Sequence, residues 1–177
     1  MLEKELVTGF SIFSELPQEK LSEVAQRGKI LEFDSNETIF QEGETALNLY
    51  GVLDGEVELS LIFRDKILKT DIQYEKSIQT RIETIEKDIV VDSIGPGEIF
   101  GWSALIRPRL LTSTAKCSKP TRIFSLPAAD LKAIFDKDPQ VGYVFMERLS
   151  EIISQRLRHR TDKLIEIWCE AFEVNRI

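Results

Sequence analysis

The sequence is poor in the residues on which metal binding and nucleophilic catalysis usually depend. Its 177 residues include one histidine, His159, and two cysteines, Cys117 and Cys169. Transition-metal sites in small β-barrel enzymes need several imidazoles that converge from strands, and a Ser-His-Asp or Cys-His site needs a histidine beside its nucleophile. His159 stands between arginines in a helical pattern, so we expect it to be an exposed helical residue. The composition therefore predicts no metal site, no catalytic residues and no enzyme.

The sequence also lacks the features that mark secreted and membrane proteins. The two cysteines stand far apart and form no Cys-x-x-Cys pair, which favours reduced structural thiols over a disulfide framework. No apolar run approaches the roughly 20 residues of a membrane span. The N-terminal stretch "MLEKELVTGFSIF" lacks the basic flank, the apolar region and the cleavage site of a signal peptide. We expect a cytoplasmic protein with no membrane partner.

Basic residues are in the minority. The chain has 23 Lys and Arg against 30 Asp and Glu, a formal net charge of −7, which argues against a surface dedicated to nucleic acid. The one basic cluster, "RLRHR" at 156–160, lies inside a long helical pattern, where a charge run is usually a solvated face. We therefore expect no nucleic-acid partner.

Short β-type segments fill the middle of the chain. Stretches such as "ETIFQEG", "NLYGVLDGEVELSLIF" and "TSTAKCSKPTRIFSLP" are rich in Ile, Val, Leu and Phe, and Gly, Pro, Asp or Asn interrupt them. A strand about every ten residues predicts an all-β barrel or roll. The stretch "LDGE" at 53–56 contains the Asp-Gly signal of a β-hairpin. The mixed-charge segment 64–87 predicts an extended hairpin with a mobile tip around 70–77 and a strand at 80–85.

Helical periodicity flanks these strands on both sides. The stretch "SELPQEKLSEVAQRG" predicts a first helix with Ser14 as its N-cap, and "AADLKAIFDKD" predicts a short helix after the last strand. A long helix then begins at Pro139, which suits a first helical turn. We expect two parts: a β-roll with N-terminal and short flanking helices at 1–138, and a C-terminal dimerisation helix at 139–172. No DNA-binding domain is expected within this chain.

The long helix carries an apolar stripe that extends over about nine turns. The stripe consists of Val141, Phe145, Leu149, Ile152, Ile153, Leu157, Leu164, Ile165, Trp168 and Phe172. A roll of this size cannot cover such a helix along its full length, so the second half must bury its apolar face elsewhere. A parallel helix pair in a homodimer is one solution, although Arg160 and Thr161 interrupt the heptad pattern. A kinked helix that packs back on its own roll is the other.

A glycine-rich loop, "GPGEIFGWSALI" at 95–106, separates two of the predicted strands. Its three glycines permit tight turns and close approach of the backbone. The stretch "WSALI" predicts the start of a short helix, whose N-terminal amides favour an anion. The alternative is a strand-to-helix turn with no ligand.

The order of these motifs resembles the cyclic nucleotide-binding domain, the family of the catabolite activator protein and of the regulatory subunit of cAMP-dependent protein kinase. The resemblance covers nearly the whole chain and rests on "IFQEGE" with Gly43, "LDGEV" with Gly55, "PGEIFG" at 96–101, and Ala104 with Leu105. It implies a mainly β fold with flanking helices. That fold is a double-stranded β-helix, a jelly-roll-like β-roll of eight strands, followed by a long C-terminal helix that often dimerises.

The resemblance also shows where this sequence departs from the family. Nucleotide-binding members have a phosphate-binding cassette that reads approximately F-G-E-x-A-L, with an arginine about nine residues after the glutamate. The resemblance implies that this glutamate accepts a hydrogen bond from the ribose 2′-hydroxyl and that the arginine pairs with the cyclic phosphate. Here Phe100 and Gly101 match, but Trp102, a hydrogen-bond donor only, stands at the glutamate position. Counted without gaps, the arginine position falls on Leu111, and Thr112 follows it.

An alternative register places Arg109 at the arginine position and needs a shorter cassette with a compensating insertion. In the favoured register both signature contacts are lost, and Trp102 is expected to plug the pocket or to pack against the roll. A residual anion site remains an alternative, formed by the amides of residues 101–104 with Thr112, Ser113 or Arg109 nearby. The candidate ligand-binding cassette comprises Gly97, Phe100, Gly101, Trp102, Ser103, Ala104, Arg109, Leu111, Thr112 and Ser113.

These features predict a non-catalytic regulatory module of cyclic nucleotide-binding type that does not bind cAMP or cGMP in the usual way. It would hold no cofactor and act by dimerisation and contact with a protein partner, through the long helix and the extended hairpin. The alternative is a sensor that binds a cyclic nucleotide or another small anion in the cassette.

Overall fold

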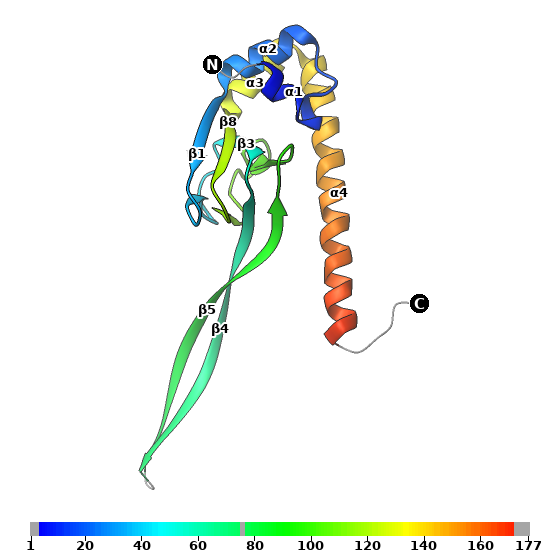
Figure 1. Ribbon diagram of the computed structural model, residues 1–177. Coiled ribbons are helices and arrows are strands. Elements are labelled where there is room, and N and C mark those ends of the chain that lie inside the picture. Colours follow the sequence, from blue (N-terminus) through cyan, green and yellow to red (C-terminus); the bar gives the residue numbers. More distant parts are fainter. Residues whose placement is uncertain (1–3, 75–76, 172–177) are drawn as a thin grey trace.

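Eight antiparallel strands form the two sheets of a β-roll (Figure 1). The structure, a computed structural model, describes residues 4–74 and 77–171. One sheet has the order β1-β8-β3-β6 and the other β2-β7-β4-β5. The strands of the first sheet are β1 (Lys29–Phe33), β8 (Thr121–Pro127), β3 (Asn48–Asp54) and β6 (Ile99–Phe100). Those of the second are β2 (Thr38–Phe40), β7 (Thr114–Cys117), β4 (Val57–Tyr74) and β5 (Ser77–Ile94). The expected mainly β roll with flanking helices and a long last helix is confirmed.

The Asp-Gly signal at 53–56 marks a turn but no hairpin. Strand β3 pairs with β6 and β8, whereas β4 pairs with β5 and β7, so the chain passes from one sheet to the other at this turn. Gly55 has φ +95°, and a Cβ there would lie 2.4 Å from Thr121 Oγ1 and 2.6 Å from the Pro120 carbonyl oxygen. The expected hairpin is therefore wrong, because a local turn signal does not specify which sheet the next strand joins.

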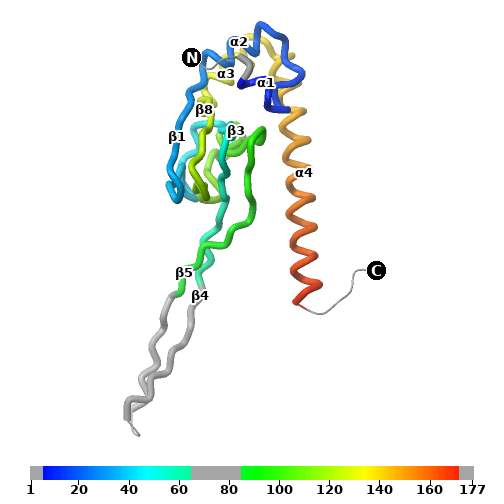
Figure 2. Tube along the Cα trace, in the orientation of Figure 1, coloured from blue at the N-terminus to red at the C-terminus, as the bar shows by residue number. Residues whose placement is uncertain are grey.

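Two helices and a short 3₁₀ turn precede the roll. They are α1 (Lys4–Thr8), the 3₁₀ helix η1 (Ser11–Phe13) and α2 (Gln18–Arg27). The N-cap of α2 is Pro17, and Ser14 instead ends η1, so the expected capping role of Ser14 is wrong. Two further helices follow the roll, α3 (Ala128–Lys137) and α4 (Pro139–Ala171). Helices α1, α2 and α3 gather at one end of the roll, and α4 runs from that end along its side (Figure 2).

The core divides into two apolar clusters. One lies inside the roll and includes Val52, Ile94 and Phe100. The other packs the flanking helices onto the first sheet, where the rings of Phe10 and Phe124 meet edge to face with their centroids 4.7 Å apart. The first half of α4 belongs to this second cluster and buries Val141, Phe145 and Leu149. These contacts fix α4 against the roll as far as its middle.

The second half of α4 leaves its large apolar side chains exposed. Its apolar side chains Leu157, Leu164, Ile165, Ile167 and Trp168 are each at least 40% exposed. The last residue of the predicted stripe, Phe172, lies outside the described residues. Among the described helices, none combines the length and the apolar character that a membrane crossing requires.

The hairpin β4–β5 extends far beyond the roll (Figure 1). Strand β4 pairs with β7 only at residues 57–60, and residues 61–74 pair with β5 alone. We call this extension, residues 61–74 and 77–89, the arm. It confirms the expected extended hairpin and the strand at 80–85. The expected tip is shorter than 70–77, since β4 continues to Tyr74 and β5 begins at Ser77; residues 75 and 76 lie outside the described part.

Candidate functional site

The cassette loop follows directly from β6. Gly101 has φ +76° and precedes a single 3₁₀ turn, η2 (Trp102–Ala104), where the sequence predicted the start of a short helix. A Cβ at Gly101 would lie 2.7 Å from a ring carbon of Tyr50 and 3.0 Å from the Asn48 carbonyl oxygen, so only glycine fits. The ring of Phe100 stacks on that of Tyr50, with centroids 5.2 Å apart.

The far end of the cassette is held by the glycine turn of the "IFQEGE" motif. The Gly43 N–H donates to the Leu111 carbonyl (2.8 Å), and the Leu111 N–H donates to the Glu44 carbonyl (2.9 Å). The Ala46 N–H donates in the same way to the Arg109 carbonyl (2.8 Å). These bonds fix the buried side chain of Leu111 toward the roll, while the side chain of Arg109 is exposed.

Most of the predicted site residues line one small cavity. The volume open to the centres of water molecules is about 50 Å³. Its lining residues are Phe40, Leu59, Phe100, Gly101, Trp102, Ser103, Leu111, Thr112, Ser113, Arg156 and Arg160. The structure thus brings Leu111 to the cavity and leaves Arg109 outside its lining.

Two other predicted residues also lie outside this lining. Gly97 has φ +85° and its N–H donates to the Val52 carbonyl (2.9 Å), so it shapes the turn before β6. Ala104 is buried in the core, and its N–H donates to the Gly101 carbonyl (3.1 Å). The 3₁₀ turn thus already uses the Ala104 amide, and the residual anion site stays a prediction.

The sequence analysis did not anticipate that α4 supplies two side chains to the cavity. The Arg156 guanidinium carbon lies 4.7 Å from the centroid of the Trp102 ring, a cation–π contact. Trp102 therefore packs between the cavity and α4 at the position where the family has its glutamate. Arg160, one turn further along α4, also lines the cavity.

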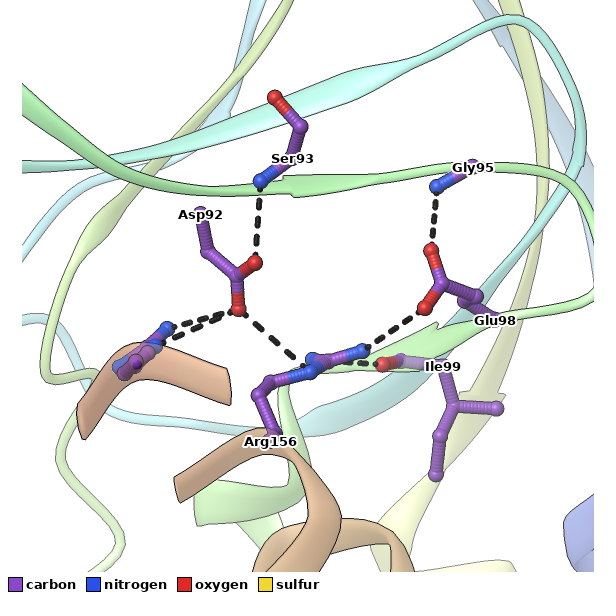
Figure 3. Close-up of polar contacts among 7 residues, drawn as sticks. Asp92, Ser93, Gly95, Glu98, Ile99 and Arg156 are labelled. Carbon is purple, nitrogen blue, oxygen red and sulfur yellow. Dashed lines mark hydrogen bonds and ion pairs between the residues drawn. The ribbon is translucent and has the colours of Figure 1, made fainter. Parts of the chain in front are cut away.

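Both arginines pair with one carboxylate, that of Asp92 at the base of the arm. Figure 3 shows the contact of Asp92 with Arg156. Asp92 Oδ2 lies 3.5 Å from Arg156 Nε and accepts hydrogen bonds from Arg160 Nη2 (3.1 Å) and Nε (3.3 Å). Its other oxygen, Oδ1, accepts from the Ser93 N–H (3.1 Å). One buried acid thus joins the second sheet of the roll to two turns of α4.

Arg156 has further partners on β6 and on the loop before it. Its Nη1 donates to the Ile99 carbonyl (3.1 Å), and its Nη2 lies 3.8 Å from Glu98 Oε1 (Figure 3). The side chains of Arg156 and Asp92 are only 9% and 7% exposed. Burial lowers the pKa of Arg156, and the nearby carboxylates of Asp92 and Glu98 oppose that shift.

The sequence predicted that the whole basic cluster at 156–160 forms a solvated face, and this is wrong for two of its residues. Arg158 and His159 are exposed, but Arg156 and Arg160 turn toward the roll. The signal that could have found them is spacing: Arg156 and Arg160 continue, at four-residue steps, the face that buries Ile152 and Leu149. Among the described residues, no three His, Cys, Asp or Glu side chains gather as a metal site.

Comparison with known proteins is consistent with this geometry. Residues 77–138 match the family model described as "Cyclic nucleotide-binding domain". This match covers about a third of the chain, and over these residues the chain resembles the cyclic nucleotide-binding domain family. Its resemblance to solved structures of this family extends along most of the chain.

A candidate cyclic nucleotide-binding protein from Geobacter metallireducens is 27% identical, with a TM-score of 0.67 over 89% of this chain and 99% of that one. The catabolite activator protein of Thermus thermophilus is 21% identical and shares the fold, with a TM-score of 0.58 over 90% of this chain and 63% of that one. A candidate potassium channel protein of Rhodopseudomonas palustris is 24% identical over 85% of this chain. This chain spans only 30% of the length of that channel protein.

The positive charge at this cavity comes from α4. The guanidinium groups in its lining are those of Arg156 and Arg160, whereas the family resemblance implies an arginine in the cassette. The apolar Leu111 lines the cavity at the position where the ungapped alignment expects that arginine.

Proposed function

We propose that this chain is a non-catalytic regulatory module of cyclic nucleotide-binding type that does not bind cAMP or cGMP in the family's usual way. It acts by dimerisation and by contact with a protein partner. The observation that carries this proposal is that α4 closes the cassette cavity to about 50 Å³ with Arg156 and Arg160 in its wall. Ligand pockets for small molecules usually measure about 300–1,000 Å³.

The chemistry of the wall supports the same proposal. Trp102 can donate one hydrogen bond but cannot accept one from a ribose hydroxyl, and its ring is already covered by Arg156. Leu111 offers no charge to a cyclic phosphate at the position that the ungapped alignment gives to the arginine. A nucleotide in the family's pose would find no acceptor for its ribose hydroxyl at Trp102 and no charge at Leu111 to offset the desolvation of its phosphate.

Calorimetric titration with cAMP and cGMP tests the proposal. We expect no heat at millimolar ligand, with circular dichroism confirming that the protein is folded. The double substitution Trp102→Glu with Leu111→Arg should create cyclic nucleotide affinity, because it restores both signature contacts. Binding by the unsubstituted chain at micromolar concentration would contradict the proposal. Such binding would support the second candidate, a cyclic nucleotide sensor in which α4 moves aside, a function that the two guanidinium groups at the cavity favour.

The proposed dimer uses the exposed half of α4. Its side chains Leu157, Leu164 and Ile167 are each at least 60% exposed, and a cluster of large apolar groups on a helix face usually marks an interaction surface. The first half of α4 already packs on its own roll, so its second half is the part available to a second copy. The arm would offer a further surface for a protein partner.

Sedimentation velocity tests the dimer with a matched pair of variants. Leu164→Glu should produce monomers, because it places a charge in the centre of the apolar face. Lys163→Glu introduces the same side chain one residue earlier, at an exposed position about 100° around the helix, and should leave the dimer intact. An unsubstituted chain that sediments as a monomer at micromolar concentration would rule out this dimer.

A further inference from the structure

The outer side of the loop between β6 and β7 combines exposed apolar groups with positive charge. Three large apolar side chains, Leu47, Ile106 and Leu110, are 67%, 40% and 47% exposed. The exposed residues Arg107 and Arg109 lie between the last two in the sequence. A tight turn holds this segment, since the Arg109 N–H donates to the Ile106 carbonyl (2.9 Å). We call these five residues the basic surface.

Leu47 belongs to the basic surface because the residues before it bind the same loop. Thr45 forms a β-bridge with Leu110, and the Ala46 N–H donates to the Arg109 carbonyl (2.8 Å). Within the part of the chain that the structure describes, neither arginine side chain of this surface makes a hydrogen bond or an ion pair. Exposed apolar groups beside two such charges are typical of an interaction surface.

A face of opposite charge lies on the first half of α4, on the side turned away from the roll. It bears the exposed residues Tyr143, Met146, Glu147, Ser150 and Glu151, which we call the acidic face. Tyr143 is 62% exposed and Met146 is 38% exposed. Glu151 accepts a hydrogen bond from Arg148 Nη1 (2.7 Å), whereas Glu147 makes no hydrogen bond or ion pair with the described residues. The charge of Glu147 is therefore available to a partner.

The two surfaces complement each other in chemistry. Both carry exposed apolar side chains, and protein interfaces are enriched in Tyr, Met and Arg, which these surfaces supply. Copies of a chain with a net charge of −7 repel each other, so a contact between copies is favoured where a basic surface meets an acidic one.

The proposed dimer also needs more contact than the end of α4 offers. Specific interfaces usually engage about 20–30 residues on each side. The second half of α4, residues 157–171, is shorter than that, and only one face of a helix can meet a partner. The acidic face belongs to the same helix, so two copies that pair along the second half of α4 would also bring this face toward the partner's roll.

We propose that the basic surface of one copy docks on the acidic face of a second copy, and that a two-fold pair forms this contact twice. Arg107 and Arg109 meet Glu147 of the partner subunit, and the apolar side chains of the two surfaces cover one another. The loop that carries the basic surface also lies beside α4 of its own copy, since Trp102 in that loop contacts Arg156. This inference rests on the proposed dimer and adds a second contact to it.

Charge reversal tests the contact by sedimentation velocity over a range of protein concentrations. Arg107→Glu with Arg109→Glu should raise the dissociation constant of the dimer about tenfold or more, because it places like charges opposite Glu147. Lys29→Glu with Lys116→Glu is the matched control, since both lysines are exposed on strands and the net charge changes equally. This control should raise the dissociation constant by less than about threefold.

A second reversal, on the helix, should restore the contact. Glu147→Arg alone should weaken the dimer, but added to the two arginine reversals it should return the dissociation constant to within about threefold of the native value. Asp136→Arg changes the net charge by the same amount at an exposed position of α3 and should restore nothing. Circular dichroism checks that each variant is folded.

The outcomes distinguish this contact from the one at the end of α4. Equal effects of the arginine and lysine reversals, or a failure of Glu147→Arg to restore the dimer, would overturn this inference and leave the contact at Leu164 standing. A dimer that survives Leu164→Glu but is lost on reversal of the arginines would overturn the contact at Leu164 and support this one. A native chain that is monomeric at micromolar concentration would overturn both.

Discussion

Asp92→Asn should be among the most destabilising single-atom changes in this protein. The substitution keeps the size of the side chain and its Oδ1 acceptor for the Ser93 N–H, but it removes the charge opposite Arg156. Breaking a buried ion pair by removing one partner costs about 3–5 kcal/mol, because the other charge stays buried without compensation. The Ile99 carbonyl and Glu98 remain as partners of Arg156, so we expect the lower end, about 3 kcal/mol.

Glu86→Gln is the matched control. Glu86 pairs with Arg64 at 2.8 Å on the arm, but both side chains are more than half exposed, and exposed pairs are worth about 0–1 kcal/mol. Each substitution removes one negative charge from a chain of net charge −7, so their effects on overall charge are equal. Urea unfolding followed by circular dichroism, at one protein concentration, measures both free energies.

Salt provides a second comparison. Raising the ionic strength should erase the small cost of Glu86→Gln and leave most of the cost of Asp92→Asn, because screening acts mainly on exposed charges. A cost of Asp92→Asn within about 1 kcal/mol, similar to that of Glu86→Gln, would refute the reasoning. Such a result would mean that Arg156 reaches water in the variant, either because water enters the site or because α4 shifts, and so does not need the Asp92 carboxylate.

Three further predictions concern the roll itself. Gly55→Ala should destabilise the protein by more than about 2 kcal/mol, because the added Cβ would clash with Thr121 and Pro120. Gly43→Ala should cost only about 1 kcal/mol, because no atom lies within 4 Å of the added Cβ; urea unfolding compares the two variants. Thr121→Val should cost about 1–3 kcal/mol in the same assay, because it removes the buried hydroxyl that accepts from the Glu56 N–H (3.1 Å) and donates to the Lys119 carbonyl (2.7 Å). Burial raises the pKa of the Cys117 thiol, so its contribution to stability is complete below its unfolded pKa of about 8.5 and is lost as the pH rises above that value. Urea unfolding should therefore show that the stability of the native chain relative to Cys117→Ala falls as the pH rises above about 8.5, and a difference independent of pH would contradict this prediction.

Strands and helices of this fold could be predicted because each has its own period and its own interruptions. The alternating segments before "GPGE" and the helical pattern after Pro139 needed no tertiary information. The turn at Gly55 was predicted correctly, but the pairing of the strands on either side of it was not. The packing of the whole roll decides that β3 and β4 join different sheets. The family resemblance predicted an altered cassette at Trp102, and this stays a prediction. The resemblance gave no sign that a side chain of α4, Arg156, contacts the Trp102 ring.

The pairing of Asp92 with Arg156 and Arg160 illustrates that limit. In the sequence, Asp92 is one acid in a β-type segment and the arginines belong to a basic run, and both patterns are typical of solvent-exposed surface. Only the path of α4 along the roll brings them together, 64 residues apart for Arg156 and 68 for Arg160. Contacts at such separation leave no periodic trace in one sequence.

The length of α4 beyond this anchor gives it a mechanical property. From Arg156 to Ala171 the helix continues for fifteen residues, or about 22 Å at 1.5 Å per residue. A rigid rod of that length converts a tilt of about 5° at its anchor into a displacement of about 2 Å at its end, which is on the scale of helix shifts that repack interfaces. Because Asp92 pairs with α4 at Arg156 and Arg160, we expect a change in these ion pairs to displace the far end of the helix more than the anchor itself.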